Sequence, residues 1–236
     1  MMSDERLRLA QKRGQARHFA FDKQAIPDTG FRTLDEEPWK PLLSQKAASA
    51  LELALQRLGL LVRDEMRILR ATAAGVLLCT KSPEEWIPCA RITATFYRGA
   101  TRASGQIDAQ TITGPLNRQI ATAVSFAIRN MRTGALKAPG RIDLPQYSDR
   151  ALFEAIVSAV THRDYSIRGS AIRLAMFEDR IEINSLGSLP NNLTIDSMNF
   201  RQSLRNEVIV SVLGRMPVAN IPGSDHCQYF MERRGY

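Results

Sequence analysis

The stretch that decides the fold is LFEAIVSAVTHRDYSIRGSAIRL, which runs from residue 152 to residue 174. Its first half places apolar side chains at helical spacing, which predicts a helix with one buried face. These apolar residues are Phe153, Ile156, Val157 and Val160. Glu154, Ser158 and His162 follow one another at intervals of four residues, so they lie along one edge of the same helix. An apolar strand over residues 171–177 is expected next.

Several short motifs occur within and after this stretch in a fixed order. They are Glu154–Ala159, His162–Ser166, Asp179–Ile183, Ser185–Pro190 and Arg205–Asn206. Together they resemble the C-terminal module of RecG-related bacterial transcriptional regulators, in which an AlbA-type (Schlafen-like) DNA-binding domain precedes a divergent GHKL-type ATPase module. The resemblance covers roughly the whole chain and implies ATP with magnesium as cofactor.

The chain departs from the resembled family at two nucleotide contacts. The resemblance implies a Glu as catalytic base and, four residues later, an Asn as magnesium ligand. This chain has Glu154 and then Ser158, whose hydroxyl is a weaker magnesium ligand than an amide oxygen. The adenine-reading Asp of a D-x-G-x-G turn is absent, because the matching turn, residues 185–189, holds no carboxylate and only Gly187 as glycine. These departures leave open that no cofactor binds.

Glu154 is therefore the catalytic candidate implied by the resemblance. The implied nucleotide-binding candidates are Ser158, His162, Arg163, Asp164 and Gly187. A structural interpretation of the His-Arg-Asp cluster is preferred over direct ligand contact. In that interpretation Asp164 caps backbone N–H groups in the turn after the helix, and His162 donates to a backbone carbonyl. Arg163 then pairs with a carboxylate such as Glu154 or Asp179.

The composition limits the class of protein. With 236 residues, of which 44% are apolar, the chain can bury a core. No apolar run approaches the roughly twenty residues that cross a bilayer, and the N-terminus lacks the apolar region of a signal peptide. The three widely spaced cysteines, Cys79, Cys89 and Cys227, suit reduced thiols and contain no C-x-x-C pair. We expect a cytoplasmic protein without membrane contact and without a metal site.

The positive charge is concentrated in the middle of the chain. The net charge is +8, and residues 87–142 carry eight basic side chains against Asp108 alone. Such an excess favours a nucleic acid through phosphate contacts and counterion release, and a solvated basic surface is the alternative. The candidate nucleic-acid-binding residues are Arg91, Arg98, Arg102, Arg118, Arg129 and Arg132.

Two enzyme classes are excluded by missing motifs. His162-Arg163-Asp164 imitates the catalytic loop of protein kinases, but Gly169 stands where that loop needs an Asn, and the chain has no D-F-G. No Gly-Lys pair occurs anywhere, so a P-loop ATPase or helicase motor is excluded as well.

The predicted fold class is α+β with two modules. Residues 1–140 are expected to form a mixed α/β module, the remnant of or linker to a DNA-binding domain, with a helix over 114–131 and a linker over 133–139. Residues 141–236 are expected to form a GHKL-like helix-on-sheet module that lacks the family's C-terminal end, with Asn206 capping a helix that begins at Glu207.

The function predicted from the sequence is a transcriptional regulator with a degenerate ATP-binding module, associated with DNA. A homo-oligomer is among the expected assemblies. Two alternatives stay open: a weak magnesium-dependent ATPase that uses Glu154 as base, and a protein-interaction module that binds no nucleotide.

Overall fold

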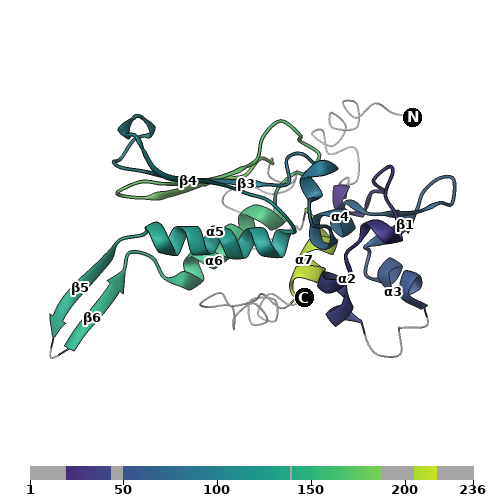
Figure 1. The fold of residues 1–236 in the computed structure, drawn as a ribbon, viewed down its shortest axis with the longest axis horizontal. Helices are drawn as coiled ribbons and strands as arrows, with labels where there is room; N and C mark the ends of the chain where they lie inside the picture. The colour runs from purple at the N-terminus through teal and green to yellow at the C-terminus, as the bar shows by residue number, and fades with distance from the viewer. Residues whose placement is uncertain (1–19, 44–49, 139, 188–204, 217–236) are drawn as a thin grey trace, which may run out of the picture.

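The computed structural model describes residues 20–43, 50–138, 140–187 and 205–216. A four-stranded sheet with strand order β4–β3–β7–β8 forms its centre. The strands are β3 (Ile92–Tyr97), β4 (Gln106–Ile112), β7 (Ile172–Met176) and β8 (Ile181–Asn184). β3 and β7 run parallel, whereas the other two pairs are antiparallel. Two helices, α5 (Leu116–Asn130) and α6 (Asp149–Thr161), lie side by side along one face of the sheet (Figure 1). The α+β class is confirmed.

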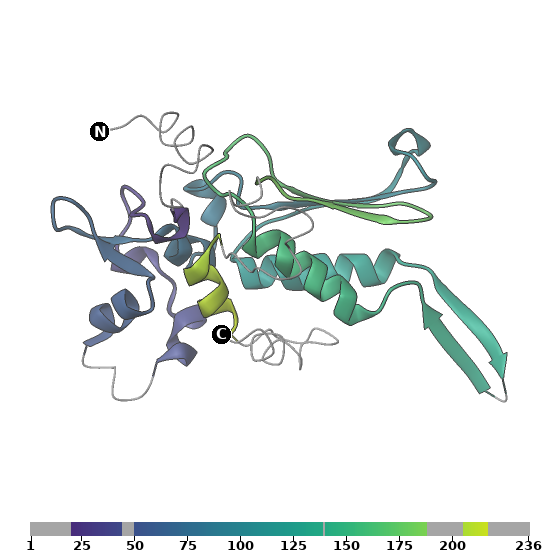
Figure 2. The same ribbon diagram turned by 180° about the vertical axis from the view of Figure 1, so that it is seen from behind.

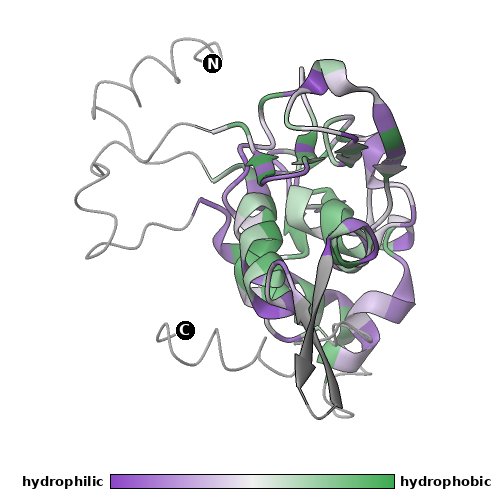
Figure 3. Ribbon diagram, turned by 90° about the vertical axis from the view of Figure 1, so that its left-hand side faces the viewer, coloured by the Kyte–Doolittle hydropathy of each residue, from purple (hydrophilic) through white to green (hydrophobic). Residues whose placement is uncertain are grey.

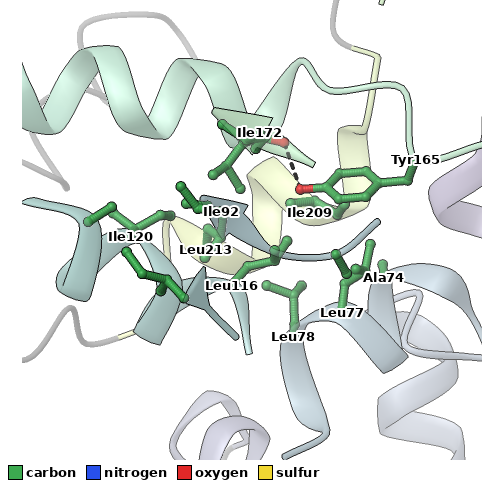
Figure 4. Close-up of a cluster of buried hydrophobic side chains, with 14 of the residues drawn as sticks. Ala74, Leu77, Leu78, Ile92, Leu116, Ile120, Tyr165, Ile172, Ile209 and Leu213 are labelled. Carbon is green, nitrogen blue, oxygen red and sulfur yellow. Dashed lines mark hydrogen bonds between the residues drawn. The ribbon is translucent and has the colours of Figure 1, made fainter. Parts of the chain in front are cut away.

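The core lies between the sheet and these two helices. Leu116 and Ile120 of α5 approach Ile92 of β3 and Ile172 of β7, and all four side chains are buried (Figure 4). Burial of such side chains is the main stabilising contribution, at about 1.5–3 kcal/mol for each one. Hydrophobic residues gather in the interior helices, and hydrophilic ones lie at the periphery (Figure 3).

The sequence patterns predicted the bounds of α5 and β7 to within two residues at each end. The helix expected over 114–131 is α5, and the strand expected over 171–177 is β7. α6 buries Leu152, Phe153, Ile156 and Val160, its apolar stripe. Its N-cap is Ser148, whose hydroxyl oxygen accepts a hydrogen bond from the backbone N–H of Ala151 at 3.2 Å.

A β-hairpin connects the two helices. Its strands are β5 (Thr133–Ala138) and β6 (Gly140–Pro145), and it projects from the far ends of α5 and α6 (Figure 2). The linker predicted over 133–139 is therefore wrong. These residues form a strand because they pair with residues 140–145, and their composition, with a single β-branched residue, does not reveal that pairing.

The sheet takes strands from both sides of the predicted module boundary. β3 and β4 precede residue 140, whereas β7 and β8 follow it. The module boundary predicted at residue 140 thus falls inside the β5–β6 hairpin. The central sheet contains strands from before this boundary and strands from after it. β3 and β7 pair in parallel, with Ile92 opposite Ile172, across a long crossover connection. The periodicity of either strand alone does not predict which strand it pairs with.

A smaller part built from short elements precedes the sheet in the chain. It contains the helices α3 (Leu51–Arg57) and α4 (Ala73–Cys79) and the paired strands β1 (Leu61–Arg63) and β2 (Leu69–Ala71). The shorter helices of the chain are η1 (Phe21–Lys23), η2 (Phe31–Thr33), α2 (Glu36–Trp39), η3 (Lys40–Leu42), η5 (Pro83–Glu85) and η6 (Arg102–Ser104).

Helix α4 is the core of this smaller part, and every one of its residues is buried. Gly75 permits its closest approach to the neighbouring chain, because a Cβ there would lie 2.3 Å from the carbonyl oxygen of Leu60. Helix α7 (Glu207–Leu213) packs against α4 and η1 and lies between this part and the α5–α6 pair (Figure 2).

Candidate functional site

Helix α6 presents the predicted Glu-Ser-His line on its surface. Ser158 and His162 are exposed, and the side chain of Glu154 is 37% exposed. One Glu154 carboxylate oxygen accepts a hydrogen bond from Nε of Arg150 at 2.9 Å, an ion pair one helical turn away. The three residues thus lie together along one accessible edge of α6, as their spacing predicts.

The turn after α6 is organised around buried Arg163. Its side chain is completely buried, and its Nη2 donates to the carbonyl oxygens of Ile167, at 3.2 Å, and Ser170. Its guanidinium carbon lies 5.6 Å from the centre of the Tyr165 ring, a cation–π contact. The prediction that Arg163 pairs with a carboxylate is therefore wrong: its partners are backbone carbonyls, and it holds the turn closed.

Asp164 and Tyr165 complete the turn. One Asp164 oxygen accepts hydrogen bonds from the backbone N–H of Ser166 at 3.1 Å and from its hydroxyl at 2.5 Å, so the predicted capping role is confirmed. The Tyr165 hydroxyl donates to the carbonyl of Val160 at 3.0 Å. Burial raises the pKa of Tyr165 well above its usual range, so this phenol stays neutral and keeps the proton that it donates.

Arg205 and Asn206 bind this turn from a distant part of the chain. Nη1 of Arg205 donates to the second Asp164 oxygen at 3.1 Å, in a pair whose side chains are 12% and 22% exposed. Asn206 is buried, and its amide donates to the carbonyls of Thr161 and Arg163, each at 2.8 Å. We call Arg163, Asp164, Tyr165, Arg205 and Asn206 the turn clamp.

The cap of α7 differs from the predicted one. Asn206 stands at the N-cap position, but its side chain donates to the turn clamp and makes no capping bond. The N-terminus of α7 is capped by Asp22, whose buried carboxylate accepts from the backbone N–H of Val208 at 2.8 Å. Burial raises the pKa of Asp22, and the helix N–H groups act in the opposite direction. No local signal in the sequence points to this contact.

The end of β8 lies against the same turn. The carbonyl of Leu186 accepts from the backbone N–H of Asp164 at 2.8 Å, and the Ser185 hydroxyl donates to the carbonyl of Ala159 at 2.8 Å. A Cβ at Gly187 would lie 3.4 Å from the carbonyl oxygen of His162. The structure thus brings Gly187 next to the residues that follow α6.

The six candidate nucleic-acid-binding arginines are all exposed, but they do not form one patch. Arg91 and Arg118 lie at the starts of β3 and α5, whereas Arg98 and Arg129 lie at or after the opposite ends of these elements. Three are already paired with carboxylates: Arg102 with Glu182, Arg129 with Asp108 and Arg132 with Glu178. Such pairing reduces the charge available to a polyanion.

The residues on α6 supply two ligand groups for a magnesium ion bound to a nucleotide. Mg²⁺ keeps several waters and needs only one or two protein oxygens beside the phosphates. Glu154 and Ser158 offer one carboxylate and one hydroxyl, one turn apart and accessible. In the described parts of the chain, no group of three or more His, Cys, Asp or Glu side chains is placed to hold a metal by itself. No helix there is long and apolar enough to cross a bilayer.

Comparisons with known proteins add the following. The family model described as "Putative ATP-dependent DNA helicase recG C-terminal" matches residues 169–236. No curated protein matches the chain. The crystal structure of the DIP2311 protein from Corynebacterium diphtheriae is similar, with a TM-score of 0.55 and 16% sequence identity. The similarity covers 90% of this chain and 42% of that one, so this chain spans less than half the length of its structural neighbour.

The family match supports the RecG-related part of the resemblance, and the structural neighbour supports the fold alone. Gly187 lies within the matched residues, whereas Glu154, Ser158 and the cluster from His162 to Asp164 precede them. The AlbA-type expectation for the N-terminal part lies outside the match and stays a prediction.

Proposed function

We propose that this chain is the nucleotide-binding, regulatory part of a RecG-like, DNA-associated transcriptional regulator. One observation carries the proposal: the RecG C-terminal match, which begins at residue 169, follows in the chain an exposed edge of α6 that presents Glu154, Ser158 and His162. The turn clamp fixes the end of that helix against β8, so the edge has a defined position.

The nucleotide phosphates and a hydrated magnesium ion would lie along this edge. Glu154 and Ser158 would hold the ion through its water shell, and the ion would neutralise phosphate charge. Ser158 contributes a shorter and weaker ligand than an amide, which favours binding over fast turnover. His162 and Gly187 lie at the end of the same edge, where the β8 turn meets α6.

The weak-ATPase alternative has less support from the geometry. A general base must be free to accept a proton from the attacking water. The Glu154 carboxylate is instead paired with Arg150 at 2.9 Å. Turnover would require this ion pair to open, whereas a hydrated magnesium ion needs only the second Glu154 oxygen, so we favour a module that binds a nucleotide and responds to it.

A route for such a response is present in the turn clamp. Arg205 and Asn206 join the end of α6 to α7, and α7 is capped by Asp22 and paired to Lys23 through Glu207. A change at the α6 edge would therefore reach the smaller N-terminal part through α7. That part would receive the response, whereas the exposed arginines beside the central sheet and on α5 would carry the association with DNA.

Thermal unfolding with and without magnesium and ATP or ADP tests the proposal. A ligand at about a hundred times its dissociation constant adds roughly 2.7 kcal/mol, which raises the unfolding temperature by several degrees. We expect a magnesium-dependent shift in the wild type and its loss in Glu154→Ala. Glu36→Ala is the matched control, since Glu36 also sits in an exposed i,i+4 pair, with Lys40 at 3.7 Å.

The possible results separate the three functions. A shift that Glu154→Ala abolishes and Glu36→Ala retains supports the site on α6. Phosphate release that Glu154→Ala abolishes would establish the weak ATPase. No shift at millimolar nucleotide would contradict the proposal and leave a protein-interaction module that binds no nucleotide.

A further inference from the structure

The face of the sheet opposite α5 and α6 is not covered by any helix of the described residues. Both views along the layers show the two helices on one side and the sheet uncovered on the other (Figures 1 and 2). Strand alternation divides the side chains between the two faces. Ile92, Ala94, Ile172 and Leu174 face the helices and are buried, so Thr93, Thr95 and Arg173 face outward.

One row of this outer face crosses all four strands with polar side chains. The register pairs Thr93 with Thr111 on one side and with Arg173 on the other, and Arg173 in turn pairs with Asn184. Thr111, Arg173 and Asn184 are exposed, and Thr93 is half-buried. Such a row presents hydroxyl, amide and guanidinium donors side by side on a flat surface.

Arg173 is the cation at the centre of this row, and no side chain of the described residues pairs with it. Arg91 directly precedes β3 and is exposed, and among the described residues its side chain donates to a backbone group, the carbonyl of Pro88 at 2.9 Å. Glu182, which lies on this face, is already shared between Arg102 and Arg180. The outer face is therefore positively charged, and its acidic group is neutralised.

An aromatic pair lies at the other end of the same face. The rings of Tyr97 and Phe177 are stacked, with centres 5.1 Å apart and an angle of 10° between their planes. The guanidinium of Arg180 lies over the Phe177 ring, 4.2 Å from its centre, and Tyr97 is partly exposed. Aromatic rings beside cations are the usual components of surfaces that bind single strands.

We propose that the outer face of the sheet binds a single-stranded nucleic acid, with Arg173 and Arg91 on phosphates and Tyr97 beside a base. The proposal rests on the nucleic-acid association in the proposed function and assigns it a place. A single strand is favoured over a duplex because a four-stranded face cannot enter a major groove, which admits a helix or a two-stranded ribbon. Open four-stranded sheet faces bind single strands in other proteins.

The test is fluorescence anisotropy with a labelled oligo(dT) strand and a duplex of equal length, titrated with the whole chain at about 50 mM salt and above. Arg173→Gln should weaken single-strand binding by about three- to tenfold, as expected for one charge-assisted contact. Arg173→Gln should also make the plot of log affinity against log salt less steep by about 0.7, the share of one phosphate contact, whereas Arg173→Lys should keep the wild-type slope.

Arg57→Gln is the control, because Arg57 is equally exposed but lies on α3, outside the sheet. An equal loss for Arg57→Gln and Arg173→Gln would overturn the proposal in favour of diffuse charge. Tighter binding of the duplex, or no binding of oligo(dT), would overturn it as well. The nucleotide-dependent thermal shift, measured on the same samples, shows separately whether the proposed nucleotide site fails.

Discussion

Replacing Asn206 by Ala removes the central contact of the turn clamp. Its side-chain amide donates two hydrogen bonds of 2.8 Å, to the carbonyls of Thr161 and Arg163, and the residue is only 1% exposed. A buried polar group left without its partner costs about 1–3 kcal/mol. With two carbonyls affected, we expect a loss of about 2–4 kcal/mol in the free energy of unfolding.

Urea denaturation followed by tryptophan fluorescence measures this loss, since Trp39 is buried and reports on unfolding. The melting temperature should fall by roughly 4–15 °C, because each kcal/mol corresponds to about 2–4 °C in a protein of this size. Asn206→Asp keeps the volume but turns a donor into a carboxylate that faces carbonyl oxygens. It should be at least as destabilising as Asn206→Ala.

The neighbouring residue provides the control. Glu207 is exposed and its ion pair with Lys23, 2.5 Å long, joins side chains that are 61% and 51% exposed. Glu207→Gln should therefore cost at most about 1 kcal/mol. If Asn206→Ala changes the free energy of unfolding by no more than this control, or if Asn206→Asp is tolerated, the turn clamp does not stabilise the protein as argued.

Two further predictions concern stability. Burial raises the pKa of Asp22 in the folded state above its unfolded value of 3.8, so at pH values between these two pKa values the folded state binds more protons than the unfolded state. The contribution of Asp22 to the free energy of unfolding therefore falls as pH rises through that window. The wild type minus Asp22→Asn difference in unfolding free energy should therefore decrease with rising pH there, and a flat or rising difference would contradict the burial argument. Gly75→Ala should lower the free energy of unfolding by about 2 kcal/mol or more, because the new Cβ would collide with the backbone of Leu60. Gly169→Ala should change it little, because nothing lies within 4 Å of a Cβ at that position. Equal falls in melting temperature for the two variants would contradict the collision as the cause.

The sequence predicted the elements whose own side chains show a period. The buried face of α6 and the outward line of Glu154, Ser158 and His162 follow from spacings of three to four residues, and strand β7 follows from a short apolar run. Both patterns are local, because they record which side chains of a single element are buried. They also identified the Asp164 cap, since capping bonds span only a few residues.

The contacts between distant segments could not be predicted in this way. Asp22 caps α7 across 186 positions, and β3 pairs with β7 across a long crossover. The sequence predicts a carboxylate partner for Arg163, but in the closed turn its partners are the carbonyl oxygens of Ile167 and Ser170. Whether an arginine is buried depends on the packing of several elements, and one sequence contains no direct sign of it.

The central claim is that the α6 edge holds magnesium and a nucleotide through Glu154 and Ser158. Calorimetric titration of ADP, with and without magnesium, on the wild type and on Ser158→Asn tests it most directly. Ser158 is exposed, so the substitution leaves the fold intact, and Asn supplies the amide oxygen that magnesium ligation favours. We predict binding that depends on magnesium in the wild type and is tighter in Ser158→Asn. Absence of binding in both proteins, or an affinity that neither magnesium nor the substitution changes, would contradict the claim.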